Sequence, residues 1–236
     1  MSSGIKPIKV YGQGGPNPPK VAIVLKELGV PFEVVPISFA DVKSPGYLAI
    51  NPNGRMPSIQ DPNTDITLWE SGAIVEYLIE RYDTAYKLSF APGTPESYHA
   101  KQWLFFQTTG QGPYYGQAVW FKVYHPETVP SAVERYAKEI LTHTRVNRVT
   151  GVVEGHLAKE KEKAGGKGDG PWLVGNKMSY ADISWVSWQV IIAKVLLSKD
   201  EYDVENYPHV KEWLEKMASR ESVVAALAAA EPKETN

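Results

Sequence analysis

The sequence predicts a chain of two parts, a small α/β domain in residues 1–87 and an all-helical domain in residues 96–236. Three observations support this prediction. Strand-type and helix-type runs alternate up to about residue 85, and residues 88–95 are rich in residues that break both. The remainder has long helical periodicity, with no strand pattern and no internal repeat. A length of 236 residues allows two small domains.

Each element of the first domain follows from a local pattern. An apolar stripe from Val21 to Leu28 predicts the first helix, and Gly29 is placed to end it. Ser44-Pro45 has the N-cap and first-position proline of a short helix, and turn residues at 61–65 predict a hairpin. A last helix follows Glu70-Ser71-Gly72. The expected strands are Ile8–Tyr11, Phe32–Ile37, Pro57–Gln60 and Ile66–Trp69.

The second domain is expected to consist of helices alone. One helix start is well specified, because Ser179 and Asp182 occupy the N-cap and N3 positions of a capping box. We therefore interpret Asp182 as a structural residue and not as a catalytic one. The expected helices are Ser97–Thr108, Ser131–Lys161, Ser179–Leu197 and Pro208–Met217.

The composition excludes several classes of protein. Without cysteine, the chain has no disulfide framework, thiolate metal site or cysteine nucleophile. A net charge of −2 argues against a nucleic-acid binder, and the five histidines lack the spacing of a metal site on a helix. The longest apolar stretch, residues 183–197, is short for a membrane span and contains Gln189 and Lys194. Since no targeting signal is recognisable, we expect a cytoplasmic protein.

The loop at residues 51–57 is the first candidate binding element. It leads into a strand whose first residue is Pro57. A proline at this position is either a plain turn proline or the second residue of a cis peptide bond. A cis Met56–Pro57 bond would turn the Met56 N–H and C=O outward, where they can pair with an extended peptide ligand. The local sequence leaves both alternatives open.

The second candidate element is Glu70-Ser71 at the start of a helix. The Ser71 hydroxyl and the amides that follow it can bind a carboxylate, and Glu70 can bind an ammonium group. Together they complement the head group of an α-amino acid. The alternative is a simple N-cap formed by Ser71, with Glu70 in water. The glycine-rich turn before the first helix is no dinucleotide loop, since Asn17 stands where the third glycine belongs.

Taken together, these motifs resemble the cytosolic glutathione transferases over nearly the whole chain. The resemblance rests on residues 51–57, on Glu70-Ser71 and on the capping motif at 174–182. Residues 16–25 and 103–117 are similar to a fungal class that includes the yeast nitrogen-regulator (prion) protein, and to the bacterial Nu class. The resemblance implies a thioredoxin-like first domain, an all-α second domain and a homodimer.

The resemblance also implies how glutathione binds. Arg135 either pairs with a glutathione carboxylate or is an ordinary surface arginine. From the γ-glutamyl end to the glycine end, the implied contacts are Glu70 and Ser71, then Met56 beside Pro57, then Lys43.

The thiol of glutathione is expected to lie beside Asn17. The thiolate is the nucleophile, and the Asn17 amide can donate a hydrogen bond to it. Tyr11 is the alternative, although its place inside a strand favours a role in the sheet. Gly15 stands where the bacterial relatives have threonine, which leaves the second contact of the thiol open. Because the chain has no cysteine, the reactive sulfur must arrive with the ligand.

The implied activity is transfer of glutathione to electrophiles, glutathione-dependent disulfide reduction, or both. The second substrate, a small apolar electrophile or a disulfide, is expected against residues 110–121, which are aromatic and glycine-rich. The same segment also suits dimer or core packing. The alternative function is a non-catalytic glutathione- or ligand-binding regulator. We favour the enzyme, since the Asn/Gln-rich tail of the yeast regulator is missing from this sequence.

Overall fold

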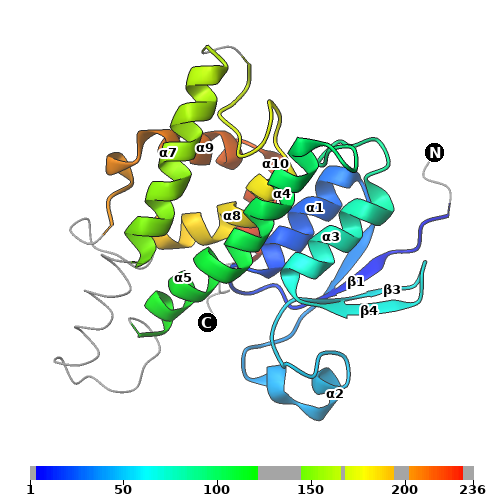
Figure 1. Cartoon of the computed structure of the whole chain (residues 1–236). Helices are drawn as coiled ribbons and strands as arrows, with labels where there is room; N and C mark the ends of the chain where they lie inside the picture. The colour runs from blue at the N-terminus through cyan, green and yellow to red at the C-terminus, as the bar shows by residue number, and fades with distance from the viewer. Residues whose placement is uncertain (1–3, 122–144, 166–167, 194–201, 231–236) are drawn as a thin grey trace. The chain divides into compact units, whose positions relative to one another are not determined.

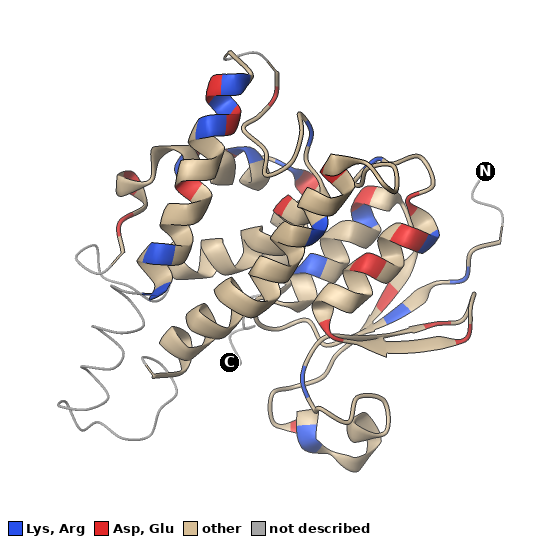
Figure 2. Cartoon of the chain, in the orientation of Figure 1, with Lys and Arg blue, Asp and Glu red and all other residues tan. Residues whose placement is uncertain are grey.

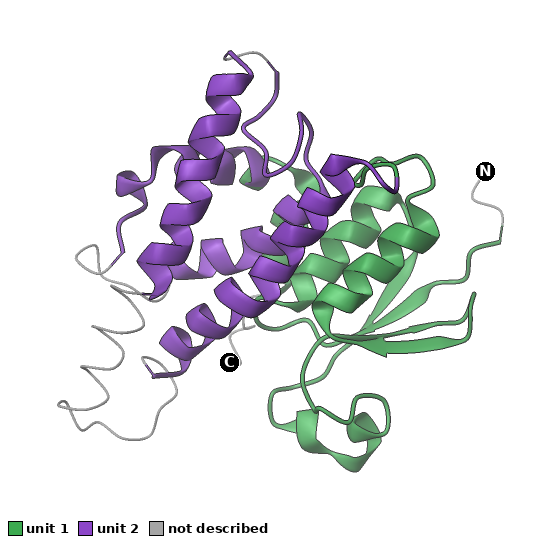
Figure 3. Cartoon of the chain, viewed as in Figure 1, with its two compact units in different colours: residues 1–91, 218–236 green, residues 92–217 purple. Residues whose placement is uncertain are grey.

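The computed structural model describes residues 4–121, 145–165, 168–193 and 202–230 (Figure 1). Contacts divide the chain into two compact units, residues 1–91 with 218–236 (unit 1) and residues 92–217 (unit 2) (Figure 3). Unit 1 contains the sheet of a thioredoxin-like domain, and unit 2 is helical in the part of the chain that the structure describes. The predicted fold class is confirmed.

Unit 1 is built on a four-stranded sheet of order β2-β1-β3-β4. β1 is parallel to β2, and β3 is antiparallel to β1 and to β4. β2 ends before Pro36, because proline has no N–H to continue the ladder. The strands are β1 (Ile8–Tyr11), β2 (Phe32–Val35), β3 (Ser58–Asp61) and β4 (Ile66–Trp69).

Helices α1 (Pro18–Leu28) and α3 (Ser71–Tyr82) pack against each other and against the sheet (Figure 1). Their apolar residues, with those of the strands, form the core of unit 1. Gly29 ends α1 as predicted, with a left-handed φ of 67° and an N–H directed back at the carbonyls of Leu25 and Lys26. The short helix α2 (Pro45–Leu48) follows the 3₁₀ turn η1 (Asp41–Lys43).

Helix α10 (Glu221–Ala230) belongs to unit 1 by its contacts, since it packs on α1. These residues belong to the predicted all-helical domain, 96–236, although the last helix named there is Pro208–Met217. The domain boundaries remain a prediction, but the contacts group residues 218–230 with the first unit. Residues 88 and 89, expected in the linker, are buried, and the Asp83 carboxylate accepts hydrogen bonds from both.

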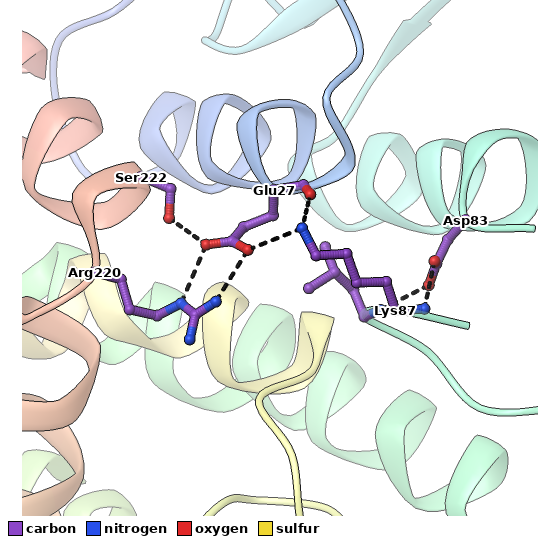
Figure 4. Close-up of polar contacts among 6 residues, drawn as sticks. Glu27, Asp83, Lys87, Arg220 and Ser222 are labelled. Atoms are coloured by element: carbon purple, nitrogen blue, oxygen red, sulfur yellow. Dashed lines mark hydrogen bonds and ion pairs between the residues drawn. The ribbon is translucent and has the colours of Figure 1, made fainter. Parts of the chain in front are cut away.

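Glu27 fixes α10 to α1 (Figure 4). Its carboxylate, at the last turn of α1, accepts two hydrogen bonds of 3.1 Å from the Arg220 guanidinium and one of 2.5 Å from Ser222. Lys87 adds an ion pair at 3.5 Å and donates to the Glu27 carbonyl. These contacts lower the pKa of the Glu27 carboxyl although its burial acts to raise it.

Unit 2 packs around α8 (Tyr180–Ile191), most of whose side chains are buried. The Trp185 indole N–H donates to the Trp103 carbonyl at 3.0 Å and ties α8 to α4 (Pro95–Phe106). The predicted helix Ser131–Lys161 is described only from residue 145 on, and residues 194–197 of the third predicted helix lie outside the description. The elements are α4 (Pro95–Phe106), the π-helical turn η2 (Gln107–Gln111), α5 (Gly112–Val119), α7 (Asn147–Lys163), α8 (Tyr180–Ile191), η6 (Val204–Asn206) and α9 (Pro208–Ala218).

The aromatic segment 110–121 is largely helical, as the end of η2 and α5. Tyr115 is fully buried, and its hydroxyl shares a hydrogen bond of 2.7 Å with Thr150. Trp120, in contrast, is 51% exposed. Part of this segment is therefore core. Within the described ranges, no helix is long and apolar enough to cross a membrane.

Candidate functional site

The register of the sheet gathers the predicted site residues at one of its ends. Tyr11, the last residue of β1, is opposite Val35, the last residue of β2. Tyr11 is also opposite Ser58, the first residue of β3, and Ser58 is opposite Trp69, the last residue of β4. The segments after β1, β2 and β4 and the segment before β3 therefore all leave the sheet at this end. They contain every predicted site residue except Arg135, which lies outside the described residues.

The loop before β3 is held in one conformation by its own polar groups. The buried Asn51 side chain donates to the Arg55 carbonyl at 2.7 Å and accepts from the Asn53 N–H at 3.0 Å. The Tyr47 hydroxyl donates to the same carbonyl at 2.7 Å. All of these groups belong to the segment 47–55, so hydrogen bonds within the segment hold the loop.

The Met56–Pro57 peptide bond is cis, which is one of the two alternatives that the sequence left open. The Met56 side chain lies against Gly12, which has a φ of 86°. A Cβ atom at Gly12 would be 2.4 Å from the Met56 sulfur, so only glycine fits there. This contact joins the turn after β1 to the loop before β3.

Lys43 reaches the same loop from η1. Its ammonium donates to the Asn53 carbonyl at 2.8 Å, at an exposed position. The Lys43 side chain passes over Gly54, where an added Cβ atom would be 2.8 Å from the Lys43 Nζ. The predicted cation for the glycine carboxylate is thus brought to the loop, with a main-chain oxygen already bound to it.

Glu70 and Ser71 do not form a simple N-cap. Glu70 is the N-cap residue of α3, and Ser71 is the first residue of the helix. Glu70 has a φ of 73°, a left-handed conformation that non-glycine residues rarely adopt. Among the described residues, no side chain caps the first turn of α3. The Asn53 amide donates to the Glu70 carboxylate at 3.4 Å, which connects Glu70 to the loop before β3.

Asn17 is the N-cap residue of α1, and its side chain makes no capping hydrogen bond. The first two helical residues are prolines and lack an N–H, so Lys20 supplies the first helical amide, which donates to the Asn17 carbonyl at 3.3 Å. The Tyr11 hydroxyl donates to the Gln60 side chain on β3 at 2.6 Å. This bond favours a sheet role for Tyr11 and leaves Asn17 as the expected partner of the thiol.

Lys20 is a charged group at this site that the sequence analysis missed. Its side chain is buried, and burial lowers its pKa to about 7, although the nearby negative charge of Glu70 acts to raise it. The available signal was a lysine inside the apolar run of a helix, one turn after Asn17. In its protonated form, Lys20 adds a positive charge that interacts with Glu70.

The rest of unit 1 has no strong charge of one sign. Figure 2 shows acidic and basic residues interspersed over its helices. In the described ranges, no group of three or more His, Asp or Glu side chains is arranged to hold a metal ion. The site therefore consists of a carboxylate, an uncapped helix start, two side-chain amides and two lysines, a set that suits a small zwitterionic ligand.

The chain is similar to known proteins over most of its length. Residues 6–80 match the family model of the glutathione S-transferase N-terminal domain, and residues 118–230 match the model of a C-terminal domain. The glutathione S-transferase-like protein gedE of Aspergillus terreus is 63% identical over 98% of each chain. The transferase URE2P6 of Phanerochaete chrysosporium, solved with oxidized glutathione, is 43% identical over 98% of each chain, with a TM-score of 0.81. Ure2p in complex with S-hexylglutathione is 33% identical over 95% of this chain and 100% of the other, also with a TM-score of 0.81.

Proposed function

Because the chain belongs to the glutathione S-transferase superfamily, in the fungal Ure2p-like class, we propose that unit 1 binds glutathione at this end of the sheet and that the protein uses its thiolate for catalysis. The observation that carries the proposal is the register that brings Asn17, Met56 and Glu70 to one end. URE2P6 and Ure2p, which are similar over most of the chain, bind glutathione or its derivatives.

The γ-glutamyl end binds at the start of α3. The Glu70 carboxylate takes the ammonium group, and the Ser71 hydroxyl with the first amides of α3 takes the carboxylate. This assignment is supported by the uncapped first turn of α3, whose amide donors are available to a ligand. The carboxylate also interacts favourably with the helix dipole at that end.

The remaining contacts follow the extended tripeptide. The main chain of Met56, beside Pro57, pairs with the cysteinyl residue as an added strand. The glycine carboxylate binds near Lys43, whose ammonium lies at 2.8 Å from the Asn53 carbonyl and can bind a second acceptor. Arg135, outside the described residues, is a further candidate for a glutathione carboxylate.

The Asn17 amide stabilises the thiolate. A free thiol has a pKa of about 8.5, so it is mostly protonated at neutral pH. A hydrogen bond from the Asn17 Nδ2 to the sulfur favours the charged form, and so does a positive charge on Lys20. The thiolate then attacks a small apolar electrophile and displaces its leaving group, or attacks one sulfur of a disulfide substrate. In the second case, the attack forms a mixed disulfide and releases the other sulfur as a thiolate, and a second glutathione completes the reduction by forming oxidised glutathione. From the family resemblance we also expect a homodimer, and analytical ultracentrifugation tests this oligomeric state.

Calorimetric titration with glutathione, followed by two turnover assays, tests the proposal. We expect binding by the wild type, weaker binding by Ser71→Ala, and glutathione-dependent turnover of chlorodinitrobenzene or hydroxyethyl disulfide. Absence of binding by the wild type would overturn the proposed site. Binding without turnover of either substrate would instead support the second candidate, a non-catalytic regulator, whose basis is the similarity to Ure2p.

A further inference from the structure

Phe39 has no role in the proposed glutathione contacts, although it lies on one of the segments that form the site. It follows β2, in the segment that also contains Lys43. Its side chain is 68% exposed, which is unusual for a phenylalanine in a well-packed unit. A single exposed aromatic residue needs no special explanation, so its meaning depends on what it contacts.

The ring of Phe39 lies on the glycine turn that precedes Asn17. A Cβ atom added at Gly14 or at Gly15 would be 3.4 Å from the ring. This is an ordinary van der Waals distance, so the ring lies directly beside the main chain of both glycines. Gly15 has a φ of 78°, which favours glycine.

The segment that bears Phe39 is fixed by local hydrogen bonds. The Ser38 hydroxyl donates to the Asp41 carboxylate at 2.6 Å and accepts from the Asp41 N–H at 3.2 Å. The Ser44 N–H donates to the Asp41 carbonyl at 2.9 Å. These bonds close a tight turn around Phe39, so its ring is presented from a defined backbone.

Distance along the chain limits how far the ring is from the thiol position. Gly15 and Asn17 are two residues apart, so their Cα atoms are separated by at most about 7.6 Å. If the glutathione sulfur lies beside Asn17, a substituent on it that contains one aromatic ring spans a distance similar to this Cα–Cα separation. The face of a phenylalanine ring also attracts the edge or the offset face of another aromatic ring.

We propose that Phe39 is a specificity-determining residue that binds the aromatic part of the second substrate beside the glutathione sulfur. The inference rests on the proposed glutathione site and assigns one contact of its second substrate to a residue of unit 1.

The role of Phe39 can be tested by measuring the binding of two glutathione derivatives, with no need for a catalysed reaction. S-methylglutathione and S-(p-nitrobenzyl)glutathione have the same peptide and differ in the substituent on sulfur. We expect Phe39→Ala to lower the affinity for the nitrobenzyl derivative about 10-fold and the affinity for the methyl derivative less than about 2-fold. Phe39→Leu, which keeps apolar surface and loses the ring, is expected to lie between Phe39→Ala and the wild type.

Tyr86→Ala is the matched control, since Tyr86 is a 43% exposed aromatic residue of unit 1 beside Lys87, at the other end of α1. It should change neither affinity. An unchanged ratio of the two affinities in Phe39→Ala would overturn the inference and leave the glutathione site intact. If the wild type fails to bind S-methylglutathione, the proposed function itself is wrong, and the inference with it.

Discussion

Helices α8 and α3 both have an acidic residue at their start, but the two carboxylates differ in how many hydrogen bonds they accept from the protein. Asp182, in the first turn of α8, accepts hydrogen bonds of 2.9 Å from the Leu173 N–H, the Ser179 N–H and the Trp213 indole. Glu70, at the start of α3, receives one longer bond of 3.4 Å from Asn53. Asp182 is fully buried, whereas Glu70 is exposed.

This difference separates a structural carboxylate from one that can bind a ligand. Burial raises the pKa of Asp182, and these three hydrogen bonds, with a fourth of 3.1 Å from the Ser179 hydroxyl, act in the opposite direction. They use the carboxylate within the fold, which agrees with the capping box predicted from the sequence. At α3, the Glu70 carboxylate is exposed and its side chain makes no capping hydrogen bond. The following changes test that contrast, from the largest expected effect to the smallest.

Lys20→Met should have the largest effect, and its size should depend on pH. The pKa of Lys20 is lowered from 10.5 to about 7, so between these values the unfolded chain binds a proton that the folded protein lacks. The unfolding free energy of the wild type therefore rises with pH in this window, by at most about 1.4 kcal/mol per pH unit. Urea unfolding at pH 6, 8 and 9.5 should show Lys20→Met more stable than the wild type at pH 6, with the gap closing as pH rises.

Lys26→Met is the control for this measurement, because Lys26 is an exposed lysine on the same helix. It should shift stability by the same small amount at each pH. A constant gap between Lys20→Met and the wild type would show that Lys20 does not change its protonation on folding.

Asp182→Ala should destabilise the protein by about 3 kcal/mol, since it leaves three buried N–H donors without an acceptor. Chemical denaturation measures the change, and Asp182→Asn, which keeps one acceptor oxygen, should lose less. The glutathione affinity of the folded fraction should stay the same. A loss of affinity at full folding would break the distinction between the two helix starts.

Glu70→Gly should affect stability and binding in opposite directions. Glycine adopts the left-handed φ of 73° without strain, so the unfolding free energy should rise by about 1 kcal/mol. Loss of the carboxylate should lower the affinity for glutathione at least about 10-fold, as for other charge-assisted contacts. Glu70→Gln keeps the side-chain length and separates the two effects, with weaker binding but no gain in stability. Equal glutathione affinity in all three proteins would exclude Glu70 from the site.

Asn17→Ala should have the smallest effect on the fold. Without the amide donor, the pKa of the bound thiol should rise by about one unit, which lowers turnover near neutral pH about 10-fold. The pH–rate profile of chlorodinitrobenzene conjugation measures this shift. If the profile is unchanged in Asn17→Ala and shifts in Tyr11→Phe, the thiol partner is Tyr11.

The sequence was sufficient for the fold class because local signals agreed with the long-range structure. Hydrophobic periodicity and the Ser179–Asp182 motif are both local, and both correspond to observed elements. The hydrogen-bond ladder from Tyr11 to Ser58 to Trp69 is a long-range property that no short motif contains. The sequence pattern also cannot show that Lys20 is buried or that Glu70 has a positive φ, since both depend on neighbours from other segments.

Helix α10 has a consequence for how the molecule is made. The N-terminus of a chain leaves the ribosome first, and N-terminal domains usually fold before C-terminal ones. Here Glu27 is bound by Arg220 and Ser222, which follow it by more than 190 residues in the sequence. During synthesis, the α1 surface that α10 covers stays open until all of unit 2 has left the ribosome. Folding of unit 1 is therefore completed last, although most of its sequence is translated first.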